Sequence, residues 1–168
     1  MQKYVIALTV LISIVAESAF FRFLSIGGVV PNLTLILVIS YALYEEENRA
    51  GLIGLLAGLS KDIVVGRIIG VSAISFMLAA YFVAHYNRKI FTEHMTTPLV
   101  LVMLATVFHE SIYLLFVFLL GYQVDLIYAF QHTWMMQLIY QLLMTLPVYV
   151  SVRRLLQWHV MKLSLIHI

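Results

Sequence analysis

The sequence contains no cysteine and few charged residues. The absence of cysteine excludes disulfide bonds, thiolate metal sites and cysteine-dependent catalysis. Only 11% of the 168 residues are charged while 63% are hydrophobic, so the chain has too little polar surface for a water-soluble globule. Ten basic and eight acidic residues give a formal net charge of +2, which does not support a nucleic-acid partner. The composition indicates a membrane protein that is surrounded mainly by the lipid bilayer.

Signatures of common enzyme classes are also missing. His109 and Glu110 are not followed by the second histidine of a helical zinc protease, because Tyr113 stands at that position. The sequence has no glycine-rich phosphate loop with Lys and Ser or Thr, and no Gly-x-Ser-x-Gly motif. We therefore expect no enzymatic activity, no cofactor and no metal site.

Continuous apolar runs, rather than alternating ones, dominate the sequence. Backbone N–H and C=O groups in lipid need internal partners, which only helices and closed barrels provide, and continuous runs favour helices. We expect an all-α integral membrane protein, a compact bundle of six transmembrane helices forming one domain over residues 1–162. The expected spans are residues 4–24, 31–44, 50–66, 68–86, 98–120 and 134–152.

The second expected span is short. At 1.5 Å per residue, residues 31–44 cover only about 21 Å, which is less than the hydrocarbon thickness of a bilayer. We therefore expect either that residues 26–30 extend this helix or that the bilayer is locally thinned.

Basic residues predict the orientation of the bundle, since Lys and Arg concentrate in short cytoplasmic loops. Six spans place both termini on one side, and seven of the ten basic residues fall on that side. We therefore expect both termini in the cytoplasm. A cleaved signal peptide at residues 4–24 is the alternative, but its length of about 21 residues argues against cleavage. The seven residues are Lys3, Arg49, Arg88, Lys89, Arg153, Arg154 and Lys162, and the other three are Arg22, Lys61 and Arg67.

The last six residues, 163–168, read Leu-Ser-Leu-Ile-His-Ile. This hexapeptide matches the translation of a transposon end sequence used in DNA library preparation, so we exclude it from fold reasoning. Our hypothesis is that the native sequence diverges after Lys162; a natural apolar tail is the alternative.

Ionisable residues within or near the spans are candidate functional residues, because an ionisable group in lipid is costly unless it is paired or solvated. For Glu17, near the outer end of its span, the structural alternative is a solvated carboxylate at the membrane interface. For Asp62, with Lys61 beside it and Arg67 beyond, the alternative is a solvated or ion-paired helix end. Glu110 is the deepest and stands beside His109. This pair could form an interhelical hydrogen bond, relay a proton or receive a polar group of a partner.

Gln137, Gln141 and Thr145 follow one another at intervals of four in the sixth expected span. This spacing places the three side chains on one helical face. Such a polar stripe either holds helices together by hydrogen bonds or lines a polar cavity, and we favour the first interpretation.

Small residues recur every four positions across the third and fourth expected spans. Residues four apart share one helical face, so Ala50, Gly54 and Gly58 form a smooth strip that another backbone can approach closely. We expect the spanning helix of a partner to dock on this strip; packing against another span of the same chain is the alternative. The full ladder is Ala50, Gly54, Gly58, Asp62, Gly66 and Gly70.

Together, the run from Pro31 to Val38, the charged break at residues 45–49 and the glycine ladder resemble the MreD family of rod shape-determining proteins. The resemblance extends to overall size and to the six-span layout, and its diagnostic part is residues 31–81. Members of the family often have Asp after the proline. Here Asn32 stands there, which removes a charge and retains the capping role.

The resemblance implies a non-enzymatic subunit of the bacterial inner membrane that acts in cell elongation. Members of the family associate with the single-span protein MreC. Through MreC they associate with the MreB filament and with RodA and a class B penicillin-binding protein, which synthesise the lateral wall.

The competing interpretation is a substrate-capture subunit of an energy-coupling-factor vitamin transporter, a group that the MreD family is thought to resemble in fold. In that case Glu17, Glu110, Gln137 and Gln141 would line a ligand pocket. The motifs from Pro31 to Gly70 favour the shape-determining interpretation.

Overall fold

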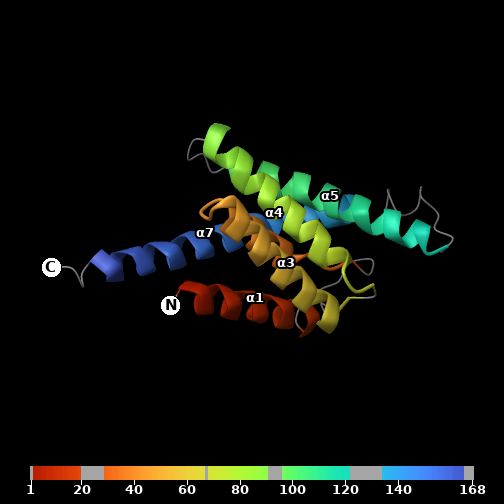
Figure 1. Ribbon diagram of the computed structural model, residues 1–168, viewed down its shortest axis with the longest axis horizontal. Helices are drawn as coiled ribbons and strands as arrows, with labels where there is room; N and C mark the ends of the chain where they lie inside the picture. Colours follow the sequence, from red (N-terminus) through yellow and green to blue (C-terminus); the bar gives the residue numbers. More distant parts are fainter. Residues whose placement is uncertain (1, 20–28, 67, 91–95, 122–133, 165–168) are drawn as a thin grey trace.

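The computed structural model describes residues 2–19, 29–66, 68–90, 96–121 and 134–164. The regular elements among these residues are six helices (Figure 1), which confirms the all-α architecture that the sequence predicts. The helices are α1 (Gln2–Ala19), α2 (Leu33–Ala42), α3 (Glu47–Val64), α4 (Val71–Ile90), α5 (Thr96–Leu119) and α7 (Met135–Ser164).

The outer surface of the bundle is apolar. Among the described helices, α5 and the segment Met135–Gln157 of α7 are long and apolar enough to cross a membrane. Large aliphatic and aromatic side chains point outward from several helices, which would be unfavourable in water and suits contact with acyl chains. Examples with exposures between 60% and 74% are Leu8, Ile63, Leu104, Phe118 and Leu143.

Helix α2 forms the centre of the bundle. All ten of its residues are buried, and it contacts α1, α3, α4, α5 and α7. A helix that is apolar on every side belongs in an interior, where it meets protein on all faces. The expectation of a lengthened helix is wrong for Val29 and Val30, which are described and not helical. Residues 26–28 of the expected extension lie outside the described residues, and local thinning of the bilayer around α2, which is about 15 Å long, stays a prediction.

Helices α3 and α4 pack more extensively than any other described pair. Gly54 and Gly58 make this close approach possible, because a Cβ atom at Gly54 would overlap the carbonyl group of Phe76, and one at Gly58 that of Ser72. The strip formed by Ala50, Gly54 and Gly58 is buried. The backbone of α4 thus occupies the place where we expected the helix of a partner, and the intramolecular alternative describes the strip.

The beginning of α1 and the end of α7 lie at the same end of the bundle (Figure 1). The turn between α2 and α3 lies at this end as well, since each helix reverses the direction of the chain. Of the hexapeptide 163–168, only the first two residues belong to α7, and residues 165–168 lie outside the described residues.

Candidate functional site

An ion pair between α1 and α3 lies at the centre of the polar residues in the bundle. Lys61 Nζ lies 2.5 Å from Glu17 Oε1, and the two side chains are only 12% and 9% exposed. Removing two charges from water is costly, and their attraction offsets the cost only where further hydrogen bonds satisfy both groups. The surroundings of this pair provide such bonds.

The beginning of α2 supplies the hydrogen bonds. Thr34 donates from Oγ1 to Glu17 Oε2 over 3.0 Å, and Lys61 Nζ donates to Asn32 Oδ1 over 2.7 Å. Asn32 Oδ1 also accepts from the backbone N–H of Leu35 over 3.0 Å, so Asn32 caps α2. The Glu17 carboxylate lies at the N-terminal end of α2, where Thr34 also donates its backbone N–H to Glu17 Oε2 over 3.4 Å. Three helices are thus fixed to one another around one ion pair.

Helix α7 joins this cluster through its polar stripe. Gln137, Gln141 and Thr145 are 7%, 0% and 0% exposed, so the predicted face does point into the bundle. Gln141 Nε2 donates to the backbone oxygen of Asn32 over 3.3 Å, and Thr145 Oγ1 donates to the backbone oxygen of Gln141. Gln141 Oε1 is buried without a hydrogen-bond partner among the described residues. The stripe contributes one interhelical bond and one buried acceptor.

His109 of α5 is linked to the ion pair through Phe76 of α4. Its Nδ1 lies 2.7 Å from Ser75 Oγ of α4, and its ring packs against Phe76 at a centroid distance of 5.1 Å. Lys61 Nζ lies 5.7 Å from the centroid of Phe76, within the range of a cation–π contact. The Glu110 side chain is only partly buried, and among the described residues it has no side-chain hydrogen bond. His109 is therefore bonded within the bundle, whereas its neighbour Glu110 is not.

Asp62 has a separate role at the turn between α3 and α4. It is 2% exposed, and its Oδ2 accepts from the backbone N–H groups of Gly70, Ser72 and Ala73 over 2.8, 3.0 and 3.3 Å. These donors are the otherwise unpaired N–H groups at the start of α4, where a negative charge is favoured. Gly70 has a φ of +101°, a conformation that favours glycine. Asp62 is therefore held by backbone amides, not by solvent as a solvated helix end would be.

Sequence reasoning missed the central position of Lys61 and the contributions of Thr34 and Ser75. Lys61 was interpreted only as a neighbour of Asp62, although adjacent residues on a helix point in different directions. A lysine in a mainly apolar helix was itself a signal, because such a residue needs a partner. Hydroxyl groups in spans give no comparable signal, since they also bond to their own helix, as Ser75 does to the backbone oxygen of Val71.

The chemistry of the cluster is that of a structural network. Its cation Lys61 and its anion Glu17 are paired with each other, and Asn32 and Gln141 form hydrogen bonds within the bundle. The described residues include no group of three His, Asp or Glu side chains that could hold a metal ion. The cluster fixes α1, α2, α3 and α7 relative to one another.

Comparison with known proteins identifies the family. The family model of the rod shape-determining protein MreD matches residues 1–159, nearly the whole chain. No curated protein and no solved structure matches the chain. The apolar helices agree with a family of membrane proteins that determine cell shape. The chain belongs to the MreD family of rod shape-determining proteins.

Proposed function

We propose that this MreD-family chain is a non-enzymatic, six-span subunit of the bacterial inner membrane that binds MreC. Through MreC it would link the MreB filament to peptidoglycan synthesis by RodA and a class B penicillin-binding protein. The match to MreD over residues 1–159 carries the proposal. The distribution of basic residues supports a cytoplasmic location for both termini.

The internal use of polar groups supports a scaffold. Lys61 is paired with Glu17 and donates a hydrogen bond to Asn32, and Asp62 accepts hydrogen bonds from the start of α4. Such a bundle offers its partners an outer surface and short turns. A rigid surface of this kind suits the docking of a partner's spanning helix, because little ordering is needed on binding.

The transporter alternative is less well supported. Its ligand pocket would use Glu17 and Gln141, but Glu17 is paired with Lys61 and Thr34, and Gln141 donates to the backbone of Asn32. A ligand would have to displace these bonds. The family match also favours the shape-determining role.

Replacement of the resident protein tests the proposal. In a rod-shaped bacterium depleted of its own MreD, we would express this chain together with the MreC encoded in the same genome. Rod shape should return, and MreC should co-purify with the chain in mild detergent. Round cells and no co-purification, with both proteins present in the membrane, would contradict the proposal. Gly58→Leu is the control for loss of the folded bundle. Its side chain would collide with the α4 backbone, so this variant should restore neither rod shape nor co-purification.

A further inference from the structure

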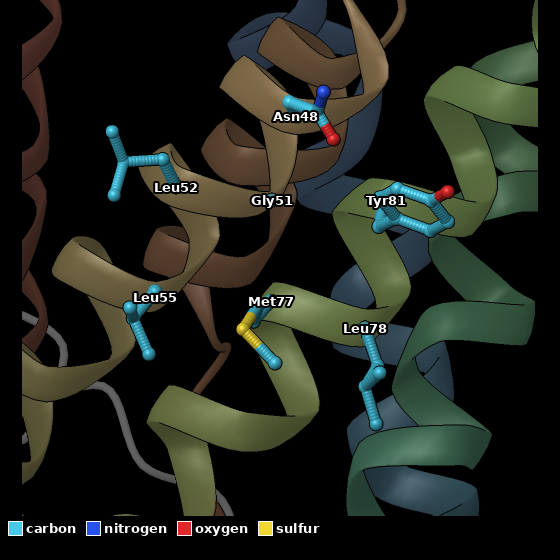
Figure 2. A pocket seen from close by; sticks show the side chains of 7 residues that line it. All are labelled: Asn48, Gly51, Leu52, Leu55, Met77, Leu78 and Tyr81. Atoms are coloured by element: carbon cyan, nitrogen blue, oxygen red, sulfur yellow. The ribbon is translucent and has the colours of Figure 1, made fainter.

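An apolar groove of about 420 Å³ runs between α3 and α4 on the outside of the bundle. The groove is lined by Gly51, Leu52 and Leu55 of α3 and by Met77, Leu78 and Tyr81 of α4 (Figure 2). Leu52 is 55% exposed, whereas Gly51 is buried, so the groove is open to the surroundings and Gly51 forms its floor. In a membrane, such a groove is filled either by an acyl chain or by a side of another helix.

The missing side chain of Gly51 creates the groove. A Cβ atom at Gly51 would lie 3.6 Å from Tyr81 Cβ and 3.8 Å from the backbone oxygen of Met77, which are ordinary contacts. At Gly54 and Gly58, by contrast, the helices approach so closely that a Cβ would overlap the backbone of α4. Of the three glycines of α3, Gly51 is therefore the one at which the two helices leave space for a Cβ.

One end of the groove carries negative charge. Asn48 lines the groove there and directly follows Glu45, Glu46 and Glu47. Glu47 Oε1 lies 3.2 Å from His85 Nδ1, and the His85 ring stacks on Tyr81, with centroids 6.3 Å apart and an interplanar angle of 9°. The acidic run is thus connected by direct contacts to the wall of the groove. It is unusual on the side of the bundle that holds most of the basic residues.

We propose that this groove receives the single spanning helix of a partner whose groove-facing side chains are apolar and whose adjoining cytoplasmic flank is basic. Charge complementarity supports this occupant, because spanning helices carry Lys and Arg at their cytoplasmic ends. The run beside Asn48 holds three acidic residues and one basic residue, Arg49, and Glu47 contacts His85 next to the groove wall. The same carboxyl groups repel the anionic headgroups of inner-leaflet lipids. The inference rests on the proposed function, in which a membrane subunit of the elongation machinery, MreC, is bound.

Cysteine cross-linking in membranes tests the location, and the chain has no cysteine to interfere. Leu52→Cys places a thiol on the groove, and Leu104→Cys on α5 is its control, since the two leucines are 55% and 62% exposed. Each variant would be paired with single cysteines along the spanning helix of MreC. On oxidation, we expect Leu52→Cys to form disulfides with cysteines on one face of the MreC helix. The yield of cross-linked product should be at least tenfold higher than with Leu104→Cys.

Filling the groove gives a second test. A Cβ at Gly51 meets only ordinary contacts, and Gly51→Leu adds a larger side chain at the floor of the groove. Its amount in the membrane and its thermal stability are measured beside those of Gly51→Ala, and Gly51→Leu should weaken co-purification of MreC at least tenfold. Leu104→Phe, which enlarges a side chain on α5, should leave co-purification unchanged. The groove proposal is overturned if cross-links form equally at both cysteines and Gly51→Leu does not weaken co-purification. The proposed function still stands in that case, provided that the unmodified chain and MreC co-purify. If unmodified chain and MreC do not co-purify, the proposed function itself fails.

Discussion

Lys61 of α3 and Glu17 of α1 form an ion pair inside a bundle whose outer surface is apolar. The pair is held at the first turn of α2 by Asn32 and Thr34. Side chains of α1, α3 and α7 are all bonded to residues 32–34 at the start of α2. The ion pair thus lies where these three helices meet the central one.

Removal of one partner of this pair should be strongly destabilising. Lys61→Met leaves a buried carboxylate without its cation, and Glu17→Gln leaves a buried ammonium, so each should cost about 3–5 kcal/mol of unfolding free energy. The double variant should lose much less than the sum of the two, because no unpaired charge remains. Reversible unfolding in mixed detergent micelles measures all three. Strict additivity of the two losses would show that the side chains do not interact.

The carboxylate of Asp62 should stabilise the start of α4. Asp62→Ala removes the acceptor of three backbone N–H groups and should cost about 2 kcal/mol, the upper range for loss of a helix cap. Asp62→Asn keeps one acceptor oxygen and should cost less. Hydrogen exchange at the amides of Ser72 and Ala73 measures the effect locally, and it should accelerate most in the alanine variant. Equal exchange in both variants would argue against the capping role.

The glycines of α3 should differ in their tolerance of alanine. Gly54→Ala and Gly58→Ala introduce a Cβ that overlaps the α4 backbone, so each should cost about 1–3 kcal/mol by overpacking. Gly51→Ala meets only ordinary contacts, and it should be neutral or stabilise the helix by up to about 1 kcal/mol. Thermal stability in detergent measures the ranking. A loss at Gly51 as large as that at Gly58 would contradict the packing described here.

Sequence patterns predicted the positions of the helices well, but they did not predict which helices and side chains contact one another. Continuous apolar runs gave five of the helices to within a few residues, and the residue type of Asn32 indicated a cap. Hydropathy could not show that α2 is central, because a helix enclosed by protein and a helix in lipid have the same apolar composition. Nor could periodicity identify Glu17 as the partner of Lys61. Spacing shows which side chains share a face, whereas their partner lies on a helix distant in the sequence.

The loop between α2 and α3 should contribute a pH dependence. Burial raises the pKa of Glu45 above its ordinary value of 4.5, and this effect outweighs the opposing effect of Arg49. A folded-state pKa above the unfolded one gives a stabilisation that is present below the unfolded pKa and is lost as the pH rises through the folded pKa. Glu45→Gln should therefore reduce the loss of stability above pH 4.5. Parallel stability curves of the two proteins between pH 4 and 7 would contradict this assignment.

Substitution of Gln141 tests whether the polar stripe of α7 is structural or belongs to a binding site. Its Oε1 is buried and has no hydrogen-bond partner among the described residues. Gln141→Leu removes one hydrogen bond to Asn32 and also a buried acceptor without a partner. These effects oppose each other, so the unfolding free energy should change by less than about 1.5 kcal/mol. Rod shape should be retained in complemented cells, because the side chain acts only within the bundle. Thr145→Val is the matched control, since that hydroxyl bonds only within α7. Round cells with a stably folded Gln141→Leu protein would instead indicate that a ligand or partner uses the amide.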